Sequence, residues 1–303
     1  MLKTIIKSVW DREVAQQLSG PEALERHGFS SVPAITVRGF LAWGLSEVGE
    51  FEEAEQALSQ AHLLLADLDE PTKAAAYVLG CEIRSLAYRG QWAACARDGR
   101  AMRASLHKRG GEREQARISL GLGRAILESR RLGTSPYAGE WQEAEAALAE
   151  ATEIFGGSLS PQVGIQTRVL WGSLCLCQGR LADALRLLAE SRQMVELWPK
   201  TAPLMGHLQW LEAQVAAASG VWAEALQWFE AACKTWGDSG LRWYCARVRL
   251  DWAQAHVSRG LPGDRQRAAD LLREAQQAFQ DMGVPRYAAI AQERLQELGS
   301  EQA

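Results

Sequence analysis

Residues 220–232, GVWAEALQWFEAA, carry the pattern that decides the fold. A glycine is followed two residues later by a large apolar side chain, five later by alanine, nine later by a bulky residue and twelve later by a small one. These positions are three or four residues apart, which is the spacing of one face of an α-helix. The glycine can adopt a left-handed backbone and end the preceding helix. The stretch therefore predicts the turn and second helix of a helical hairpin.

The same pattern recurs roughly every 40 to 49 residues, a longer period than the about 34 residues of the shortest tetratricopeptide unit. Its six anchors are Gly49, Gly90, Gly139, Gly179, Gly220 and, more weakly, Gly263. Further helical stretches flank these copies, and they cover residues 33–48, 72–89, 112–132, 163–178, 203–219, 241–259 and 284–298. The small residues of each copy let two helices approach closely, and the bulky residue fills the groove between them. We therefore predict an all-α, right-handed superhelical solenoid of about six to seven tetratricopeptide-like hairpins.

The predicted array occupies residues 32–303, and residues 1–31 form an N-terminal capping helix and loop. Apolar residues at positions 2, 5, 6, 9, 14 and 18 would lie on one stripe of this first helix. Turn-forming residues at 19–21 and 27–33 separate it from the array.

The composition excludes several classes of protein. The 303-residue chain is 47% hydrophobic and 23% charged, with a net charge of −4, so no overall field would draw it onto nucleic acid or an anionic membrane. Its apolar runs are shorter than the about 20 residues that span a bilayer, so we expect a cytoplasmic protein. The six cysteines lie in apolar helical stretches of a large chain and are expected to be reduced.

Two stretches of the sequence, ERHGFSSVP at 25–33 and FLAWGLSEVGEF at 40–51, resemble the C-terminal tetratricopeptide region of large bacterial signalling proteins. In those proteins the array follows a STAND-type ATPase module, often with a nucleotide cyclase or a DNA-binding domain elsewhere. Residues 267–285, RAADLLREAQQAFQDMGVP, are similar to their last repeat. The resemblance implies the role of a sensor or docking surface. The chain has no G-x-x-x-x-G-K-[ST] phosphate loop. The glycines at 121 and 123 lie inside an expected helix and are not followed by the lysine of that motif. It is therefore either a free-standing repeat protein or part of a longer one.

Sites of chemistry are not identifiable in the sequence. Cys175 and Cys177 would point about 200° apart on a helix and cannot converge on one metal ion. The five histidines lack ligand spacing, and the acidic clusters at 47–55 and 67–70 span helix ends and loops. We predict no metal, no cofactor and no enzymatic activity, although an all-helical toroid enzyme with acids facing a central funnel remains a less favoured alternative.

The twelve tryptophans include several with a structural position in the repeat. Trp92, Trp141 and Trp222 follow a turn glycine by two residues, and Trp236 ends a second helix, as do phenylalanines in other copies. First helices line the concave surface in this architecture, and Trp, Tyr and Arg supply most of the binding energy at interfaces. The predicted concave-face binding residues are Trp43, Tyr77, Arg84, Tyr88, Arg130, His207, Trp210, Gln214, Arg247 and Gln254.

A separate stripe of arginines, Arg97, Arg100 and Arg103, recurs every three residues and is predicted to be a local docking patch for an acidic partner. The sequence thus favours a non-catalytic scaffold or regulatory module for a protein or peptide. Nucleic acid and membrane are not expected as partners, and self-association is left open. The alternative is a sensor domain that binds a small-molecule inducer. An enclosed pocket of about 300 Å³ or more lined by first-helix aromatics would favour the sensor, and an open channel would favour peptide binding.

Overall fold

The computed structural model describes residues 15, 18, 24, 25, 32–68, 72–106, 111–133, 138–156, 161–198 and 201–300. Thirteen α-helices and no strand make up this part of the chain. The predicted capping helix lies outside the described residues except for Ala15 and Leu18. The chain forms two compact units, one of residues 1–130 and 135–154 and the other of residues 131–134 and 155–303. This division inside the array was not predicted, and the proposed boundary at residue 31 stays a prediction.

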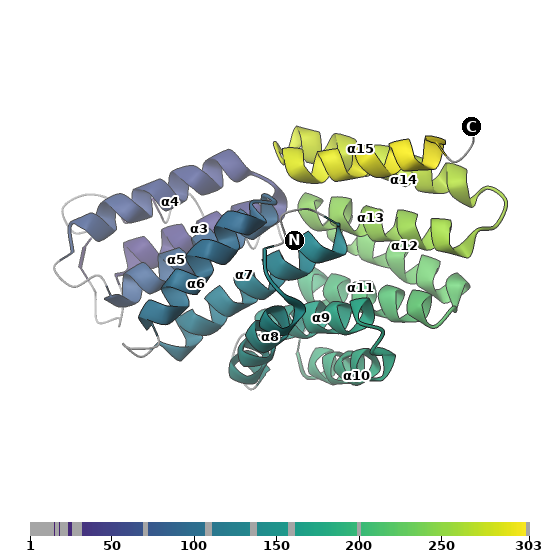
Figure 1. The fold of residues 1–303 in the computed structure, drawn as a ribbon. Helices are drawn as coiled ribbons and strands as arrows, with labels where there is room; N and C mark the ends of the chain where they lie inside the picture. Colours follow the sequence, from purple (N-terminus) through teal and green to yellow (C-terminus); the bar gives the residue numbers. More distant parts are fainter. Residues whose placement is uncertain are drawn as a thin grey trace. The chain divides into compact units, whose positions relative to one another are not determined.

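The first unit is built from three helical hairpins (Figure 1). Its helices are α3 (Pro33–Val48), α4 (Phe51–Ala66), α5 (Thr72–Tyr88), α6 (Trp92–Leu106), α7 (Glu112–Arg131) and α8 (Trp141–Gly156). Helix α3 packs against both α4 and α5, and α5 packs against α6. Helix α7 packs closely against α5 at Gly121, where an added Cβ would lie 2.6 Å from the Ile83 side chain.

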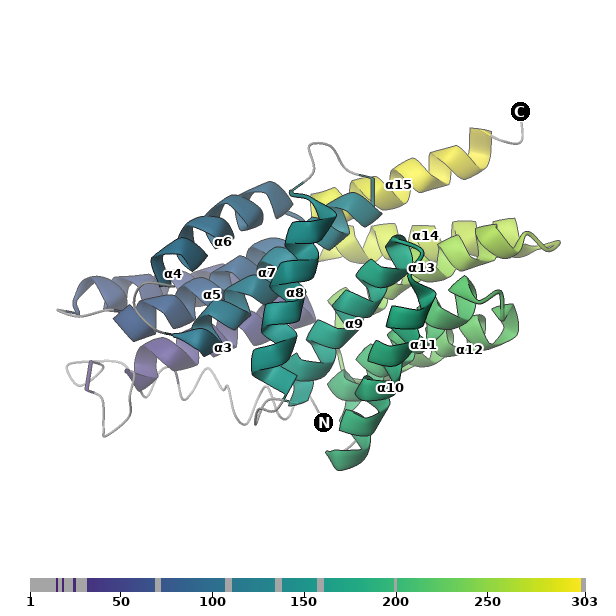
Figure 2. The same cartoon turned by 60° about the horizontal axis from the view of Figure 1, so that its bottom comes forward.

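The second unit repeats the arrangement with seven helices (Figure 2). They are α9 (Pro161–Cys177), α10 (Leu181–Leu197), α11 (Ala202–Ala218), α12 (Trp222–Asp238), α13 (Arg242–Arg259), α14 (Asp264–Asp281) and α15 (Pro285–Ser300). Each helix packs against the next, and α11 also contacts α9 and α13. The predicted all-helical hairpin fold is confirmed, and the bounds of the seven first helices differ from those predicted by at most two residues. The handedness of a superhelix through both units stays a prediction.

The recurring small residues lie in the helix contacts, as predicted. The residue five places after each anchor glycine is fully buried in all six copies, at Ala54, Cys95, Ala144, Ala184, Ala225 and Ala268. Among the bulky residues nine places after the anchor, Leu148, Phe229 and Leu272 are at most 2% exposed. Close packing of this kind has few voids, so the volume of each small residue is fixed by its neighbours.

The turn glycines follow the prediction at four of the six anchors, because α13 ends at Gly260 and the anchor Gly263 stands directly before α14. Gly49, Gly90, Gly179 and Gly220 have φ between 73° and 93°, the left-handed region that ends a helix. The prediction is wrong at Gly139, because Gly133 adopts the left-handed backbone after α7 (φ 70°).

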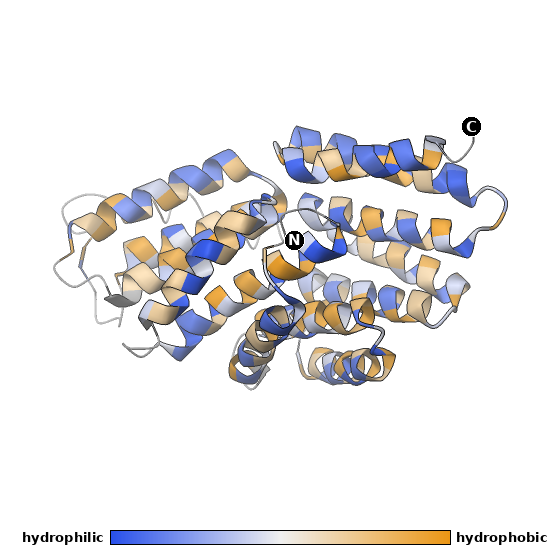
Figure 3. Ribbon diagram, in the orientation of Figure 1, coloured by the Kyte–Doolittle hydropathy of each residue, from blue (hydrophilic) through white to orange (hydrophobic). Residues whose placement is uncertain are grey.

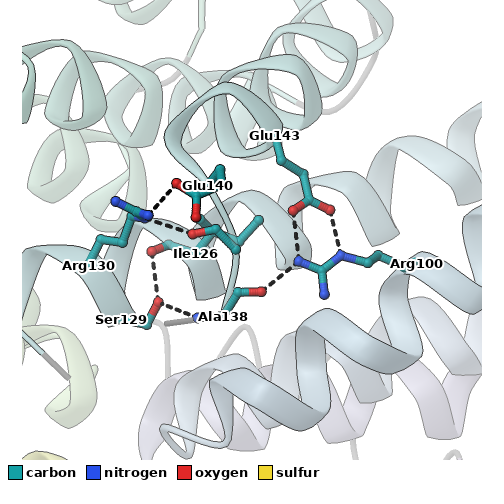
Figure 4. Close-up of polar contacts among 8 residues, drawn as sticks. Arg100, Ile126, Ser129, Arg130, Ala138, Glu140 and Glu143 are labelled. Atoms are coloured by element: carbon teal, nitrogen blue, oxygen red, sulfur yellow. Dashed lines mark hydrogen bonds and ion pairs between the residues drawn. The ribbon is translucent and has the colours of Figure 1, made fainter. Parts of the chain in front are cut away.

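Gly139 lies where side chains approach the backbone closely, and it does not form the left-handed turn. A Cβ there would lie 2.5 Å from Glu143 Oε2 and 2.6 Å from Arg100 Nη2. Figure 4 shows the Arg100 guanidinium between the carboxylate of Glu143 and the carbonyl oxygen of Ala138, with nitrogen–oxygen distances of 2.6 to 2.7 Å. This clamp holds the start of α8 against α6.

Second helices are amphipathic, whereas several first helices are buried on most sides. Figure 3 shows hydrophobic and hydrophilic residues alternating around α4 and α14. Helix α13, in contrast, buries Trp243, Tyr244, Arg247 and Asp251 together with most of its other residues. Polar side chains on the first helices are therefore removed from water and need partners inside the protein.

Candidate functional site

In the first unit, the predicted concave-face residues form a partly charged core. Tyr77, Arg84 and Tyr88 are at most 7% exposed, and Trp43 is partly buried. The Arg84 guanidinium lies 3.9 Å from the centre of the Trp43 ring, and its Nη2 is 3.7 Å from Glu47 Oε1. The same carboxylate oxygen accepts a hydrogen bond of 3.0 Å from Tyr88 Oη. These side chains hold α3 and α5 together, and Glu47 was not among the predicted site residues.

Arg130, the fifth predicted residue of this unit, secures the connection between α7 and α8. Its Nε donates to Gly139 O at 2.7 Å, its guanidinium is paired with Glu140, and it lies 5.3 Å from the Trp141 ring centre (Figure 4). These contacts with the connection between α7 and α8 account for an arginine at position 130.

The arginine stripe of α6 is compensated by acids. The shortest nitrogen–oxygen distances are 2.7 Å for Arg97–Asp98, 2.6 Å for Arg100–Glu143 and 2.5 Å for Arg103–Glu150. Because each arginine has a carboxylate partner, the stripe presents less positive charge than its sequence indicates. The docking patch stays a prediction.

In the second unit, four of the five predicted residues are buried. His207, Trp210, Gln214 and Arg247 are at most 6% exposed, whereas Gln254 is exposed. His207 lies among aromatic rings, with its ring centre 4.8 Å from that of Tyr244. The remaining four gather around one carboxylate and the cleft beside it.

That carboxylate belongs to Asp251, a residue that the sequence interpretation missed. Asp251 Oδ1 accepts from Arg247 Nη1 at 2.8 Å, and Oδ2 accepts from Trp210 Nε1 at 2.8 Å and from Arg131 Nη2 at 2.9 Å. Arg131, the last residue of α7, belongs to the second unit. Arg247 and Asp251 are four residues apart on one helix, so this part of the cluster was readable from the sequence.

Burial alone would raise the pKa of Asp251. The charges of Arg131 and Arg247, with the hydrogen bonds from Arg247 and Trp210, outweigh burial and hold this pKa below its ordinary value. Asp251 is therefore an ionised, fully engaged carboxylate at neutral pH.

Beside this cluster lies a cleft of about 490 Å³, and all of its lining residues belong to the second unit. Its buried floor includes Ser173, Gln214, Phe229 and Asp251. Its exposed rim is formed by Cys177, Ala218, Gln254 and Ser258. The rim residues lie on α9, α11 and α13, so the cleft crosses three successive first helices.

The charge lining the cleft is predominantly positive. Arg131 and Arg294 lie in its wall with Asp251, and Arg247 stands behind Asp251. Arg294 Nη1 donates to Leu250 O at 3.3 Å. Burial lowers the pKa of Arg294, and repulsion from Arg247 and Arg131 lowers it further. Asp251 and Glu297 act on Arg294 in the opposite direction, so three arginines and two carboxylates leave an excess of one positive charge.

Among the described residues, no group of three or more His, Cys, Asp and Glu side chains could hold a metal ion. No helix within the described ranges has the length and apolar character needed to cross a membrane.

Comparisons with known proteins add a distant structural similarity. No protein-family model matches the chain, and no curated protein matches its sequence. Among solved structures, the chain is similar to a Rap protein complexed with competence and sporulation factor, with 11% sequence identity and a TM-score of 0.45. The match covers 88% of this chain and 98% of the Rap chain. A similarity at this level does not carry the function of one protein to the other.

Proposed function

We propose that the chain is a non-catalytic binding module that holds a peptide, or an extended segment of a partner protein, in the cleft of its second unit. The observation that carries this proposal is the cleft itself, with a buried polar floor and an exposed rim across α9, α11 and α13. Binding sites are typically apolar concavities with a few placed polar groups. Here Leu176, Trp222 and Phe229 supply apolar surface next to the polar floor.

The chemistry of the lining supports binding more than catalysis. The lining residues include one carboxylate, Asp251, and no histidine. General acid–base catalysis works best with a pKa near the operating pH. The pKa of Asp251 is instead held low, and both of its oxygens accept hydrogen bonds from neighbouring residues. Such a carboxylate is a weak base and suits a fixed structural charge.

A second candidate function is a sensor of a small molecule, and the size of the cleft favours it. A volume of about 490 Å³ lies within the about 300 to 1,000 Å³ of typical small-ligand pockets. Peptide binding is preferred because the rim is exposed on three helices, so that a bound chain could continue beyond the cleft. The aromatic side chain of Trp210 lies behind the polar floor, hydrogen-bonded to Asp251.

Panning a random peptide library on the folded chain tests the proposal. Ala218 is an exposed rim residue, so Ala218→Trp would fill the cleft without disturbing the core. Ala223 is exposed on α12 outside the cleft lining, and Ala223→Trp is the matched control. We expect enriched peptides to bind the wild type and the control, and to lose binding to Ala218→Trp in calorimetric titrations.

Enriched peptides that bind all three proteins equally would place binding elsewhere and contradict the proposal. If no peptide is enriched, a small-molecule mixture should be tested by thermal shift. A rise in melting temperature of the wild type that Ala218→Trp abolishes would favour the sensor.

A further inference from the structure

We infer that the cleft recognises a carboxylate, carried by a peptide whose neighbouring apolar side chain packs against Trp222 and Phe229. This inference rests on the proposed binding function and names the chemistry of its ligand. It is carried by the charge of the cleft and by buried donors without partners, beside an acid whose two oxygens already accept hydrogen bonds.

The first observation is the excess of cationic groups. Two carboxylates, those of Asp251 and Glu297, lie near three guanidinium groups, those of Arg131, Arg247 and Arg294, which leaves an excess of one positive charge. A buried charge without a counter-ion is costly, so like charges in a shielded cluster favour the entry of an anion. Guanidinium groups also match the planar geometry of a carboxylate and can donate two parallel hydrogen bonds.

The second observation concerns two buried donors. Gln214 is 6% exposed and lines the cleft, and its Nε2 has no hydrogen-bond partner. The Nη1 atom of Arg131, another cleft residue, is likewise buried without a partner. A buried donor left unsatisfied destabilises the free protein, and the cost is recovered when an acceptor arrives. Two donors from different helices, α11 and α7, therefore call for an acceptor in the cleft.

The third observation is that both oxygens of the acid already present accept hydrogen bonds from other donors. Asp251 uses Oδ1 for Arg247 and Oδ2 for Trp210 and Arg131. The complementary ligand group is consequently an acceptor with negative charge.

The size of the cleft indicates that this anion is part of a larger ligand. A volume of about 490 Å³ exceeds the needs of one carboxylate, and Leu176, Trp222 and Phe229 supply an apolar wall. A peptide meets both requirements through its C-terminal carboxylate or an acidic side chain beside an apolar residue. The first source ends at the cleft, and the second lets the chain continue across the rim.

Three short N-acetylated peptides test the inference directly. The first is alanyl-leucyl-phenylalanine with a free carboxylate, the second is its C-terminal amide, and the third is glutamyl-leucyl-phenylalanine amide. Their dissociation constants for the full chain can be measured from ligand-detected NMR titrations. We expect one acidic peptide to bind about tenfold more tightly than the neutral amide, the ratio expected for hydrogen bonds to charged groups. Which acidic peptide binds identifies the source of the carboxylate.

Matched variants locate the effect. Arg294 is partly exposed, so Arg294→Gln should fold and should remove the preference for the acid. Arg131→Gln is a second variant with the same expected result. Arg286→Gln makes the same charge change on α15 outside the cleft lining and should keep the preference. Circular dichroism confirms the helical content of each variant.

Equal binding of the acids and the amide, or an equal preference in Arg294→Gln and the wild type, would overturn the inference. Absence of detectable binding by all three peptides would also overturn it. The peptide-library experiment tests the proposed binding function independently of the carboxylate. If enriched peptides lose binding when the cleft is filled but need no carboxylate, the proposed binding function holds and only the inference of carboxylate recognition is wrong.

Discussion

Asp251→Asn is the most informative single change in the second unit. The asparagine keeps a carbonyl oxygen that can accept the hydrogen bond of Trp210, so the substitution removes mainly the charge. It leaves Arg247, which is fully buried, and Arg131, whose side chain is 18% exposed, without their shared counter-ion. Removing one partner of a buried ion pair typically costs about 3 to 5 kcal/mol. Because Arg131 retains some contact with water, we expect a loss near the lower end, about 3 kcal/mol at pH 7.

The pH dependence of this loss is the distinguishing feature. The folded-state pKa of Asp251 is lowered, and its unfolded-state pKa is about 3.9. A group of this kind contributes stability that is complete above the unfolded-state pKa and disappears as the pH falls through the folded-state pKa. The difference in stability between wild type and Asp251→Asn should therefore be constant above about pH 5 and shrink below about pH 4.

Urea unfolding followed by far-ultraviolet circular dichroism measures the difference, with the midpoint shift converted through the mean m value. Asp270→Asn is the matched control, because Asp270 Oδ1 pairs with Arg273 at 2.6 Å on the exposed face of α14. Exposed pairs contribute about 0 to 1 kcal/mol, so this variant should resemble the wild type. An Asp251→Asn variant as stable as the control, or a loss that persists unchanged at pH 3, would refute the reasoning.

Three further changes test packing and the cleft. A Cβ at Gly206 would lie 2.3 Å from Trp236 Nε1. Gly206→Ala should therefore destabilise the protein by about 1 to 2 kcal/mol in thermal or urea unfolding. Gly237→Ala is the control and should be neutral, because its Cβ would make only an ordinary contact at 3.9 Å. Cys177 is the exposed cysteine among the six; iodoacetamide should modify it first by mass spectrometry, and a cleft ligand should slow the reaction. Gln214→Leu removes the unpartnered donor, so the free energy of unfolding should stay unchanged or rise by about 1 kcal/mol. The same variant should bind the acidic peptide more weakly. A loss of stability above 2 kcal/mol would contradict the unpartnered state of Gln214.

The helices and their packing were predictable because the information is local. The residues at 49, 51, 54, 58 and 61 recur as a set, and each set specifies one turn and one amphipathic face. The exception at Gly139 has a physical reason. A longer connection after α7 separates the residue that ends the helix, Gly133, from Gly139, where an added Cβ would meet the side chains of Glu143 and Arg100.

The Asp251 cluster was not predictable in the same way, because it depends on how repeats stack. Arg131 and Asp251 are 120 residues apart, and Trp210 and Asp251 are 41 apart, about one repeat. A template that describes each hairpin separately contains no information on which residues of successive first helices meet. It placed Trp210, Gln214 and Arg247 on the correct helices but did not indicate their burial or their shared partner.

Both units bury charged side chains, and the cleft is the feature that supports the second unit as the proposed binding site. In the first unit Glu47 accepts from Tyr88 and lies beside Arg84, which also stacks on Trp43, and the buried Trp43 Nε1 has no hydrogen-bond partner. In the second unit three arginines lie near the two carboxylates of Asp251 and Glu297, and buried donors of Arg131 and Gln214 remain without partners beside an open cleft.

An array selected for stability alone would not keep such groups, because well-packed apolar residues of similar volume are usually at least as stable as a buried ion cluster. Departures of this kind from the rules of stable packing occur characteristically at functional sites. The unsatisfied donors destabilise the free second unit and favour the bound one, so the same side chains that weaken the fold would provide the affinity for an anionic ligand.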